Sequence, residues 1–195
     1  MSKYYLFLIA FLVVVVSCGG GSTEDYYPKP MGYLRVAFPE RTYSVYSSDC
    51  PYSFEMPDYF AVIDKDSMCN KKDIFMERFN ATLNLTYIPV DTNLNELLER
   101  SRQFVYEHSQ FADAIEEEQI LNNENRTFGI RYNIKGDAAS PFQFYLTDSS
   151  DHFMRGALHF NVKPNYDSIR PSLDYILVDM DRMLSTVKWE NDSLK

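Results

Sequence analysis

The chain of 195 residues has little glycine, little histidine and no excess of positive charge. Its seven glycines and nine prolines follow no fixed period, which excludes collagen-like and low-complexity material. Lys and Arg number 19 against 28 Asp and Glu, so the net charge of -9 repels nucleic acid and anionic lipid headgroups. We therefore expect no nucleic-acid partner. With 45% hydrophobic residues, the chain can still bury a core of its own.

The familiar catalytic motifs are also absent. The sequence has no Gly-x-Ser-x-Gly elbow, no His-Glu-x-x-His pair, no phosphate-binding glycine loop and no dinucleotide fingerprint. Its three histidines, His108, His152 and His159, lie far apart and fit a helix, a turn and a strand. The acidic run 116–118 beside Asp113 is typical of a solvated face. We predict a protein that is not an enzyme and that has neither a catalytic residue, a metal site nor a cofactor.

The longest apolar run lies at the N-terminus and is too short to cross a membrane. It covers about 13 residues, from Tyr4 to Val16, against the roughly 20 that a transmembrane helix needs. Residues 1–17 therefore predict a signal peptide. Val15-Val16-Ser17-Cys18 fits the lipobox of bacterial lipoproteins, in which Cys18 becomes the lipidated first residue. The alternative is an ordinary cleaved signal peptide followed by a chance cysteine.

The predicted mature chain is a tether followed by one domain. Residues 18–31 contain three glycines, polar residues and two prolines, as a tether does, and residues 32–190 form a single domain. Each buried methylene contributes about 0.8 kcal/mol, so acyl chains such as palmitate would hold Cys18 on a bilayer. Gly19 is not the aspartate that retains lipoproteins at the inner membrane of enteric bacteria. This favours the outer membrane, with the domain facing the periplasm.

Cys50 and Cys69 remain after export, in a compartment outside the reducing cytosol. We expect them to form a disulfide, which would stabilise the fold by roughly 3 kcal/mol through closure of a loop of about 20 residues. A redox-active pair would more often have Cys-x-x-Cys spacing, and a metal site would need further ligands nearby.

Short β-prone runs separated by turns fill the first half of the domain. We expect strands over the ranges 33–38, 43–46, 52–55, 59–63, 75–79 and 82–88. Residues 64–72 are polar and predict a loop. The run 82–88 is the clearest, because Leu83, Leu85 and Tyr87 alternate with polar residues as in a half-buried strand.

The second half predicts two helices around a meander. Residues 91–93 supply capping side chains for a helix that ends near Gln110, and the ambiguous run 111–121 favours a strand. Three alternating strands follow, at 127–134, 142–147 and 153–162. Asp167 or Ser168 would cap a last helix, with Pro171 in its first turn. This order predicts an α+β fold, an antiparallel sheet with two helices packed on it.

Three Asp-Ser-apolar triplets are similar to the O-glycosylation sequon of Bacteroidota envelope proteins. Their serines are Ser67, Ser168 and Ser193. Such triplets are common by chance, and Ser168 is also explained as a helix cap.

Several separated stretches carry a family resemblance. They are Pro-Lys-Pro-Met-Gly-Tyr-Leu-Arg at 28–35, Asp-Cys-Pro-Tyr-Ser-Phe-Glu at 49–55, residues 106–117, residues 136–148 with Ala-Ala-Ser-Pro at 138–141, His-Phe-Met-Arg-Gly-Ala-Leu at 152–158, and the helix ending at Trp189. In this order the chain resembles the gliding motility lipoprotein GldD family of Bacteroidota. The late meander and last helix also resemble small exported domains of the PsbP type.

The resemblance implies a lipoprotein needed for gliding motility and for the type IX secretion system. It supplies no catalytic motif. We expect a non-enzymatic assembly or stabilising component of the cell envelope whose partners are other gliding or secretion lipoproteins. The alternatives are an envelope enzyme or small-ligand or metal-binding protein with a pocket from Arg35, His108, Asp113 or His159, and an export chaperone for secreted cargo.

Overall fold

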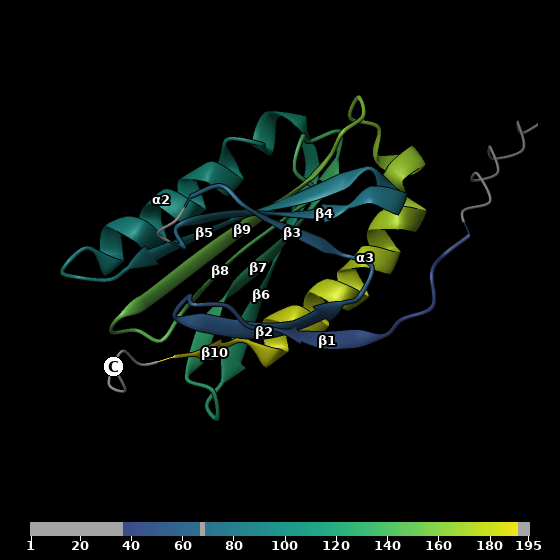
Figure 1. Cartoon of the computed structure of the whole chain (residues 1–195). Helices are drawn as coiled ribbons and strands as arrows, with labels where there is room; N and C mark the ends of the chain where they lie inside the picture. The colour runs from purple at the N-terminus through teal and green to yellow at the C-terminus, as the bar shows by residue number, and fades with distance from the viewer. Residues whose placement is uncertain (1–36, 67–68, 191–195) are drawn as a thin grey trace, which may run out of the picture. The chain divides into compact units, whose positions relative to one another are not determined.

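The computed structural model describes residues 37–66 and 69–190, and within them it contains two helices and ten strands in antiparallel sheets (Figure 1). About 26% of the described residues are helical, 3-10 turns included, and 44% are in strands. The α+β class is therefore confirmed. The predicted signal peptide, the tether with Cys18, and Arg35 lie outside the described residues.

The larger sheet has seven strands in the order β3-β4-β5-β9-β8-β7-β6, and every neighbouring pair is antiparallel. Its strands are β3 (Ala61–Asp64), β4 (Lys71–Met76), β5 (Ala81–Pro89), β6 (Ala112–Asn122), β7 (Thr127–Gly136), β8 (Phe142–Thr147) and β9 (His152–Phe160). The three strands of the predicted meander are β7, β8 and β9. The expected strand at 111–121 is β6, which settles the helix-or-strand ambiguity of that run.

A second, three-stranded sheet was not predicted as a separate layer. It has the order β1-β2-β10 and is built from β1 (Tyr43–Tyr46), β2 (Tyr52–Pro57) and β10 (Lys188–Trp189). Tyr52 and Phe54 of β2 are buried, and β10 brings the end of the described chain beside them. The first strands of the chain and its last strand thus form one small sheet.

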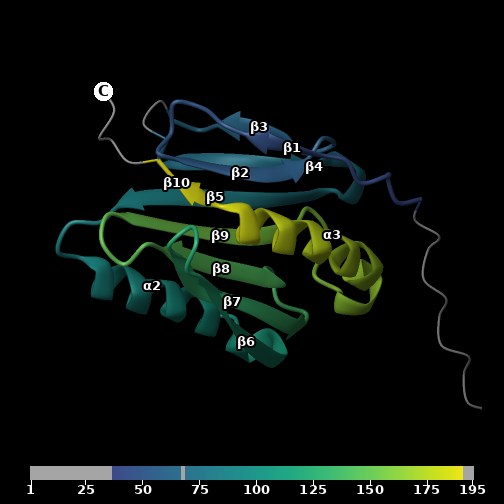
Figure 2. The ribbon, with the colours of Figure 1, turned by 90° about the horizontal axis from the view of Figure 1, so that it is seen from below.

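The two helices lie on opposite faces of the larger sheet (Figure 2). Helix α3 (Tyr166–Thr186) packs its buried stripe against β2 and against the large side chains of β5, β8 and β9, which together form the main core. Helix α2 (Leu94–Tyr106) covers a smaller cluster, in which Val105 meets Tyr132 and Ile134 of β7. The side chains of β8 alternate between the two faces, as the period of a strand requires: Phe142, Phe144 and Leu146 lie in the main core, and Tyr145 packs against the smaller cluster.

Two helix caps differ from the prediction. Asn165, not Asp167 or Ser168, caps α3, because its side chain accepts the N–H of Ser168. Pro171 then lies inside the helix, beyond its first turn. Asn93 precedes α2, but its side chain accepts the N–H of Asp91 and not a helical one.

Several boundaries also differ. Helix α2 ends at Tyr106 and not near Gln110, and a 3-10 turn, Ser109–Phe111, leads into β6. The expected strand at 75–79 is the end of β4 followed by a second 3-10 turn, Glu77–Phe79. Residues 71 and 72, expected in a loop, begin β4. Of the strand expected at 33–38, residues 33–36 lie outside the described residues, and residues 37 and 38 are not in a strand. The ring of Phe38 stacks on Tyr175 of α3, with 4.4 Å between the ring centroids.

Candidate functional site

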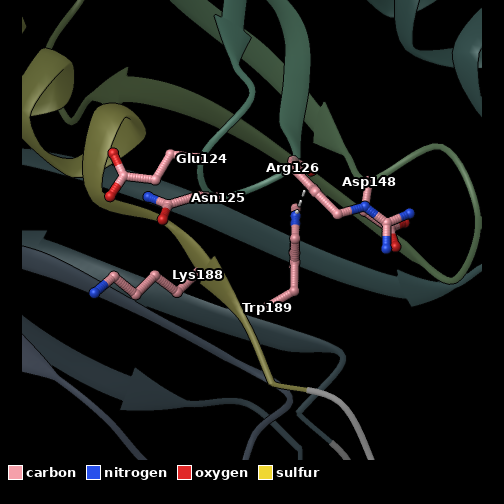
Figure 3. A pocket seen from close by; sticks show the side chains of 6 residues that line it. All are labelled: Glu124, Asn125, Arg126, Asp148, Lys188 and Trp189. Carbon is pink, nitrogen blue, oxygen red and sulfur yellow. Dashed lines mark hydrogen bonds between the residues drawn. The ribbon is translucent and has the colours of Figure 1, made fainter.

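A pocket of about 240 Å³ lies where the β6–β7 turn, the β8–β9 turn and β10 meet (Figure 3). It is open and mostly polar. Its lining residues are Glu124, Asn125, Arg126, Asp148, Lys188 and Trp189. The β8–β9 turn was predicted from its polar, turn-forming residues, whereas the β6–β7 turn was not. That both turns meet β10 could not be predicted from the sequence, because it depends on pairing between distant segments.

Asp148 uses its carboxylate to shape the β8–β9 turn. It accepts the backbone N–H groups of Ser150, Asp151 and His152 and also the Ser150 hydroxyl. Burial alone would raise its pKa, but these hydrogen bonds lower the pKa to about 2. The carboxylate is therefore committed to the fold and is a poor proton acceptor at neutral pH.

Trp189 forms one side of this pocket. Its indole N–H donates to the carbonyl oxygen of Arg126 over 3.3 Å, and its ring stacks on His152 with 5.2 Å between centroids. His152 in turn shares a hydrogen bond of 2.8 Å with the Tyr87 hydroxyl. These contacts give His152 a structural partner on each side. The pocket thus offers two cations, Arg126 and Lys188, and no pair of nucleophile and base.

The structure tests the alternative pocket expected from Arg35, His108, Asp113 and His159. Burial, and then the nearby charge of His159, lower the pKa of His108. Nδ1 of His159 lies 3.2 Å from the Ala139 carbonyl oxygen. Within the described ranges, no hydrogen bond or ion pair joins Asp113 on β6 to either histidine, and no group of three or more His, Cys, Asp or Glu could hold a metal ion.

A narrow cleft lies between α2 and the larger sheet. It is lined by Ser101, Val105, Tyr132, Gln143, Phe144, Tyr145 and Arg155. The guanidinium of Arg155 lies 4.1 Å from the centre of the Phe104 ring. Burial, and then the nearby charge of Arg100, lower the pKa of Arg155. No ion pair to Arg155 occurs among the described residues.

Cys50 and Cys69 are joined by a disulfide with a Cα–Cα distance of 5.5 Å. The bond fastens the start of β2 to the residues just before β4, and thus links the two sheets. Cys69 has a left-handed backbone (φ 63°), and its carbonyl oxygen accepts the Tyr52 hydroxyl over 3.4 Å. Cys50 is buried in the main core, which shields its end of the disulfide from solvent.

A fully buried carboxylate, missed at the sequence level, fixes the beginning of the domain to α3. Asp179 is 0% exposed. Its carboxylate accepts hydrogen bonds from the guanidinium of Arg41 over 3.0 Å, from the hydroxyl of Tyr43 over 2.7 Å and from the hydroxyl of Tyr59. We call these four residues the Asp179 cluster. Burial and the hydrogen bond to Asp179 raise the pKa of Tyr43 to about 12 and also raise the pKa of Tyr59.

β6 is an edge strand of the larger sheet. It pairs with β7 on one side, and its outer side pairs with no strand in the described part of the chain. Its middle is the run 116–118. Glu116 forms an ion pair with Lys135 at 2.5 Å, Glu118 pairs with Arg131 at 2.5 Å, and Glu117 accepts the Tyr106 hydroxyl. We call the outer side of β6, with the residue that precedes it (Phe111), the acidic edge.

Two large apolar side chains stand at the two ends of the acidic edge. Phe111 is 59% exposed and Leu121 is 71% exposed. Tyr106, beside the middle of the strand, is also exposed. The sequence predicted this strand and a solvated acidic run. It did not predict that the run would lie on an edge strand of a sheet.

Of the three candidate glycosylation serines, Ser168 lies in the first turn of α3, where its N–H is used by the Asn165 cap. Ser67 and Ser193 lie outside the described residues. Within the part of the chain that the structure covers, neither helix has the length and apolar character needed to pass through a bilayer.

The comparison with curated proteins finds no match. A family model described as gliding motility lipoprotein GldD matches residues 23–189. The match begins in the predicted tether and ends in β10, so it includes both sheets, both helices, the disulfide and the Asp179 cluster. The chain therefore belongs to the gliding motility lipoprotein GldD family, with the role in gliding motility and the membrane association that this family implies.

Proposed function

We propose that the protein is a non-enzymatic assembly or stabilising component of the gliding apparatus and of type IX secretion, and that it acts through contacts with other envelope lipoproteins. Family membership supports the gliding role and the lipid anchor. The domain organisation that we propose is a signal peptide over 1–17, a tether over 18–31 that is lipidated at Cys18, and one domain over 32–190. The anchor would lie in the outer membrane, with the domain facing the periplasm.

The acidic edge is the observation that carries the role in protein contacts. Phe111 and Leu121 expose large apolar surfaces at its two ends, and its backbone has no partner strand among the described residues. Exposed apolar side chains beside unpaired strand edges are typical of surfaces that bind other proteins. By contrast, Asp148 in the pocket beside β10, and His152, on which Trp189 stacks, already use their polar groups within the fold.

The test is crosslinking followed by purification of the native, lipidated protein from outer membranes, with a Cys18→Ala variant as the comparison. We expect gliding or secretion lipoproteins to be recovered with the native protein and lost with the variant, because the variant cannot be acylated. Recovery of the native protein alone would overturn the assembly role. The Cys18→Ala protein must keep its circular dichroism spectrum for the comparison to count.

A second candidate function is binding of a small anionic ligand under α2. The observation that favours it is Arg155, whose half-buried guanidinium forms no ion pair with a carboxylate among the described residues. Native mass spectrometry of the purified full chain separates the two candidates. A stoichiometric small anion that disappears in Arg155→Met would support ligand binding, whereas a mass equal to that of the protein and its lipid supports the assembly role.

A further inference from the structure

We propose that the acidic edge binds an extended, basic segment of a partner protein, which adds a strand beside β6. The inference rests on the proposed assembly role, and it adds to that role the chemistry of the partner. Its basis is the length of the strand, the distribution of charge along it, and the exposed apolar residues at its ends.

The length of β6 makes it suitable for strand addition. β6 has 11 residues and spans about 35 Å, whereas β3, the strand at the other end of the same sheet, has only four residues. Proteins commonly protect exposed edges by keeping them short. β6 is protected only at its start, where its register with β7 shifts between Ala112 and Ala114. From Ala114 to Asn122 the pairing with β7 is regular, so nine residues present an even edge.

The charge on β6 favours a basic partner. Asp113 and the run 116–118 place four carboxylates on this strand, whereas β7 offers two cations, Arg131 and Lys135. The side chains of Glu116 and Glu118 remain 55% and 62% exposed although each has a cation on β7. A lysine or arginine on an added strand would lie on the open side of these carboxylates, since opposite charges on neighbouring strands attract.

The same charges exclude a second copy of this chain as the occupant. If two copies of β6 paired antiparallel over their full length of 112–122, Glu117 would lie opposite Glu117, and Glu116 would lie opposite Glu118. Like charges directly opposite each other destabilise a strand pair. A shift that separates the acidic runs would also remove much of the pairing. The strand is thus unsuited to self-association.

The apolar ends specify the rest of the partner segment. Phe111 and Leu121 lie before and near the end of β6, on either side of the acidic run. Solvation of the strand does not explain two large apolar side chains that are more than half exposed at these positions, whereas contact with a partner would remove them from water. We therefore infer a segment of about ten residues with basic residues in its middle and apolar residues near its ends.

The test uses the full, lipidated chain in detergent and three synthetic peptides of ten residues. One peptide alternates Lys with Val and ends in Leu, the second replaces Lys with Glu, and the third keeps the basic sequence but carries N-methyl groups on alternate backbone nitrogens. Binding is measured by fluorescence anisotropy, and the site is located by amide hydrogen exchange. The N-methylated peptide has the same charge but cannot form the hydrogen bonds of a strand pair on its blocked edge.

We expect the basic peptide to bind and to slow amide exchange within 113–121, and we expect the other two peptides to bind at least about tenfold more weakly. Glu117→Lys should weaken binding about tenfold, whereas Glu99→Lys, an equal charge change on the exposed side of α2, should not. Equal binding of the N-methylated peptide, or protection outside β6, would overturn the proposal. So would protection of β6 in the peptide-free protein, through a second copy or through its own residues 18–36.

The outcome is separable from the proposed assembly role. If lipoproteins still co-purify with the Glu117→Lys variant and the basic peptide does not bind, the acidic edge is not the contact surface and the assembly role stands. If the native protein recovers no lipoprotein, the assembly role fails regardless of the peptides. If both the peptide and the co-purified lipoproteins are lost in Glu117→Lys but kept in Glu99→Lys, the acidic edge is the contact surface.

Discussion

Asp179 shows how a single buried charge can determine where a chain segment lies. A carboxylate at this position would be costly to bury alone, but Arg41, Tyr43 and Tyr59 satisfy it. The sequence contains a weak signal for this role, since Asp179 falls on the apolar stripe of α3 between Ile176 and Met183. Its three partners lie more than 100 residues away in the sequence, and no local pattern could have identified them.

The first prediction is that Asp179→Ala lowers the free energy of unfolding by about 3 kcal/mol, because it leaves Arg41 and two hydroxyls without their acceptor. Urea unfolding followed by circular dichroism measures this change. The control is Asp174→Ala on the same helix, whose exposed ion pair with Arg170 should contribute less than about 1 kcal/mol. Equal losses in the two variants would contradict the role of the Asp179 cluster.

The second prediction concerns pH and Asp148. Its pKa is about 2 in the folded protein, against an ordinary value of 3.8. A lowered pKa stabilises the fold above the ordinary value, and this contribution is lost as the pH falls from about 4 to 2. Asp148→Ala should therefore be about 2 kcal/mol less stable than the native protein at pH 7. The difference between the two proteins should shrink as the pH approaches 2.

Denaturant unfolding of both proteins at several pH values measures this difference. Because every other titrating group is shared, comparison of the two proteins isolates Asp148. A difference that stays constant between pH 7 and pH 2 would mean that Asp148 contributes through packing and not through its negative charge. In that case the turn between β8 and β9 would not depend on the hydrogen bonds to the carboxylate.

At the scale of elements, alternation of apolar and polar residues was the most informative part of the sequence. It predicted β5, β7, β8 and β9 closely, because each of these strands places one set of side chains in a core. The small sheet was harder to predict, since β10 has only two residues and pairs with a strand far away in the chain. The caps differed because several neighbouring polar residues could serve, and only the geometry of the folded turn selects Asn165.

For the candidate site, too, the sequence predicted local features and not the pairing of distant segments. The sequence suggested an acidic strand at 111–121 and turns at 135–137 and 147–151, which depend on local residue types. It could not show that β6 is the last strand of the sheet or that β10 closes a pocket beside the β8–β9 turn, because both depend on pairing between distant segments. The settings of two histidines were predicted wrongly: His108 lies in the turn after α2 and not in the helix, and His152 begins β9 and does not lie in a turn, whereas His159 lies in a strand as expected.

The third prediction is that reduction of the Cys50–Cys69 bond, or the double change Cys50→Ser and Cys69→Ser, lowers the free energy of unfolding by about 3 kcal/mol. The bond closes a loop with a sequence separation of 19 residues and fastens β2 of the small sheet to β4 of the larger one. Amide exchange should rise first in β1, β2 and β3, which depend most on this link. Uniform destabilisation of β7 and β8 instead would contradict the local role of the disulfide.

At the scale of the whole molecule, the Asp179 cluster and the disulfide both act on the part of the domain that follows the predicted tether. Arg41 and Tyr43 attach the start of the described chain to α3, and the disulfide attaches β2 to the larger sheet. A force applied through a lipid at Cys18 would therefore meet two cross-links before it reached the meander. The acidic edge lies on β6, at the end of that sheet beyond the meander, which leaves it available to a partner while the anchor is attached.

The last prediction tests the side of the membrane on which the domain lies. If the domain faces the periplasm, proteinase K added to intact cells should leave it uncut, because the outer membrane excludes the protease. Permeabilisation of the outer membrane should then allow cleavage in the tether, after which the folded domain is released from the membrane fraction. A Cys18→Ala variant, which cannot be acylated, should be missing from the outer-membrane fraction before any protease is added. Cleavage in intact cells would place the domain on the cell surface, and the acidic edge would then have to recognise a surface partner and not a periplasmic one.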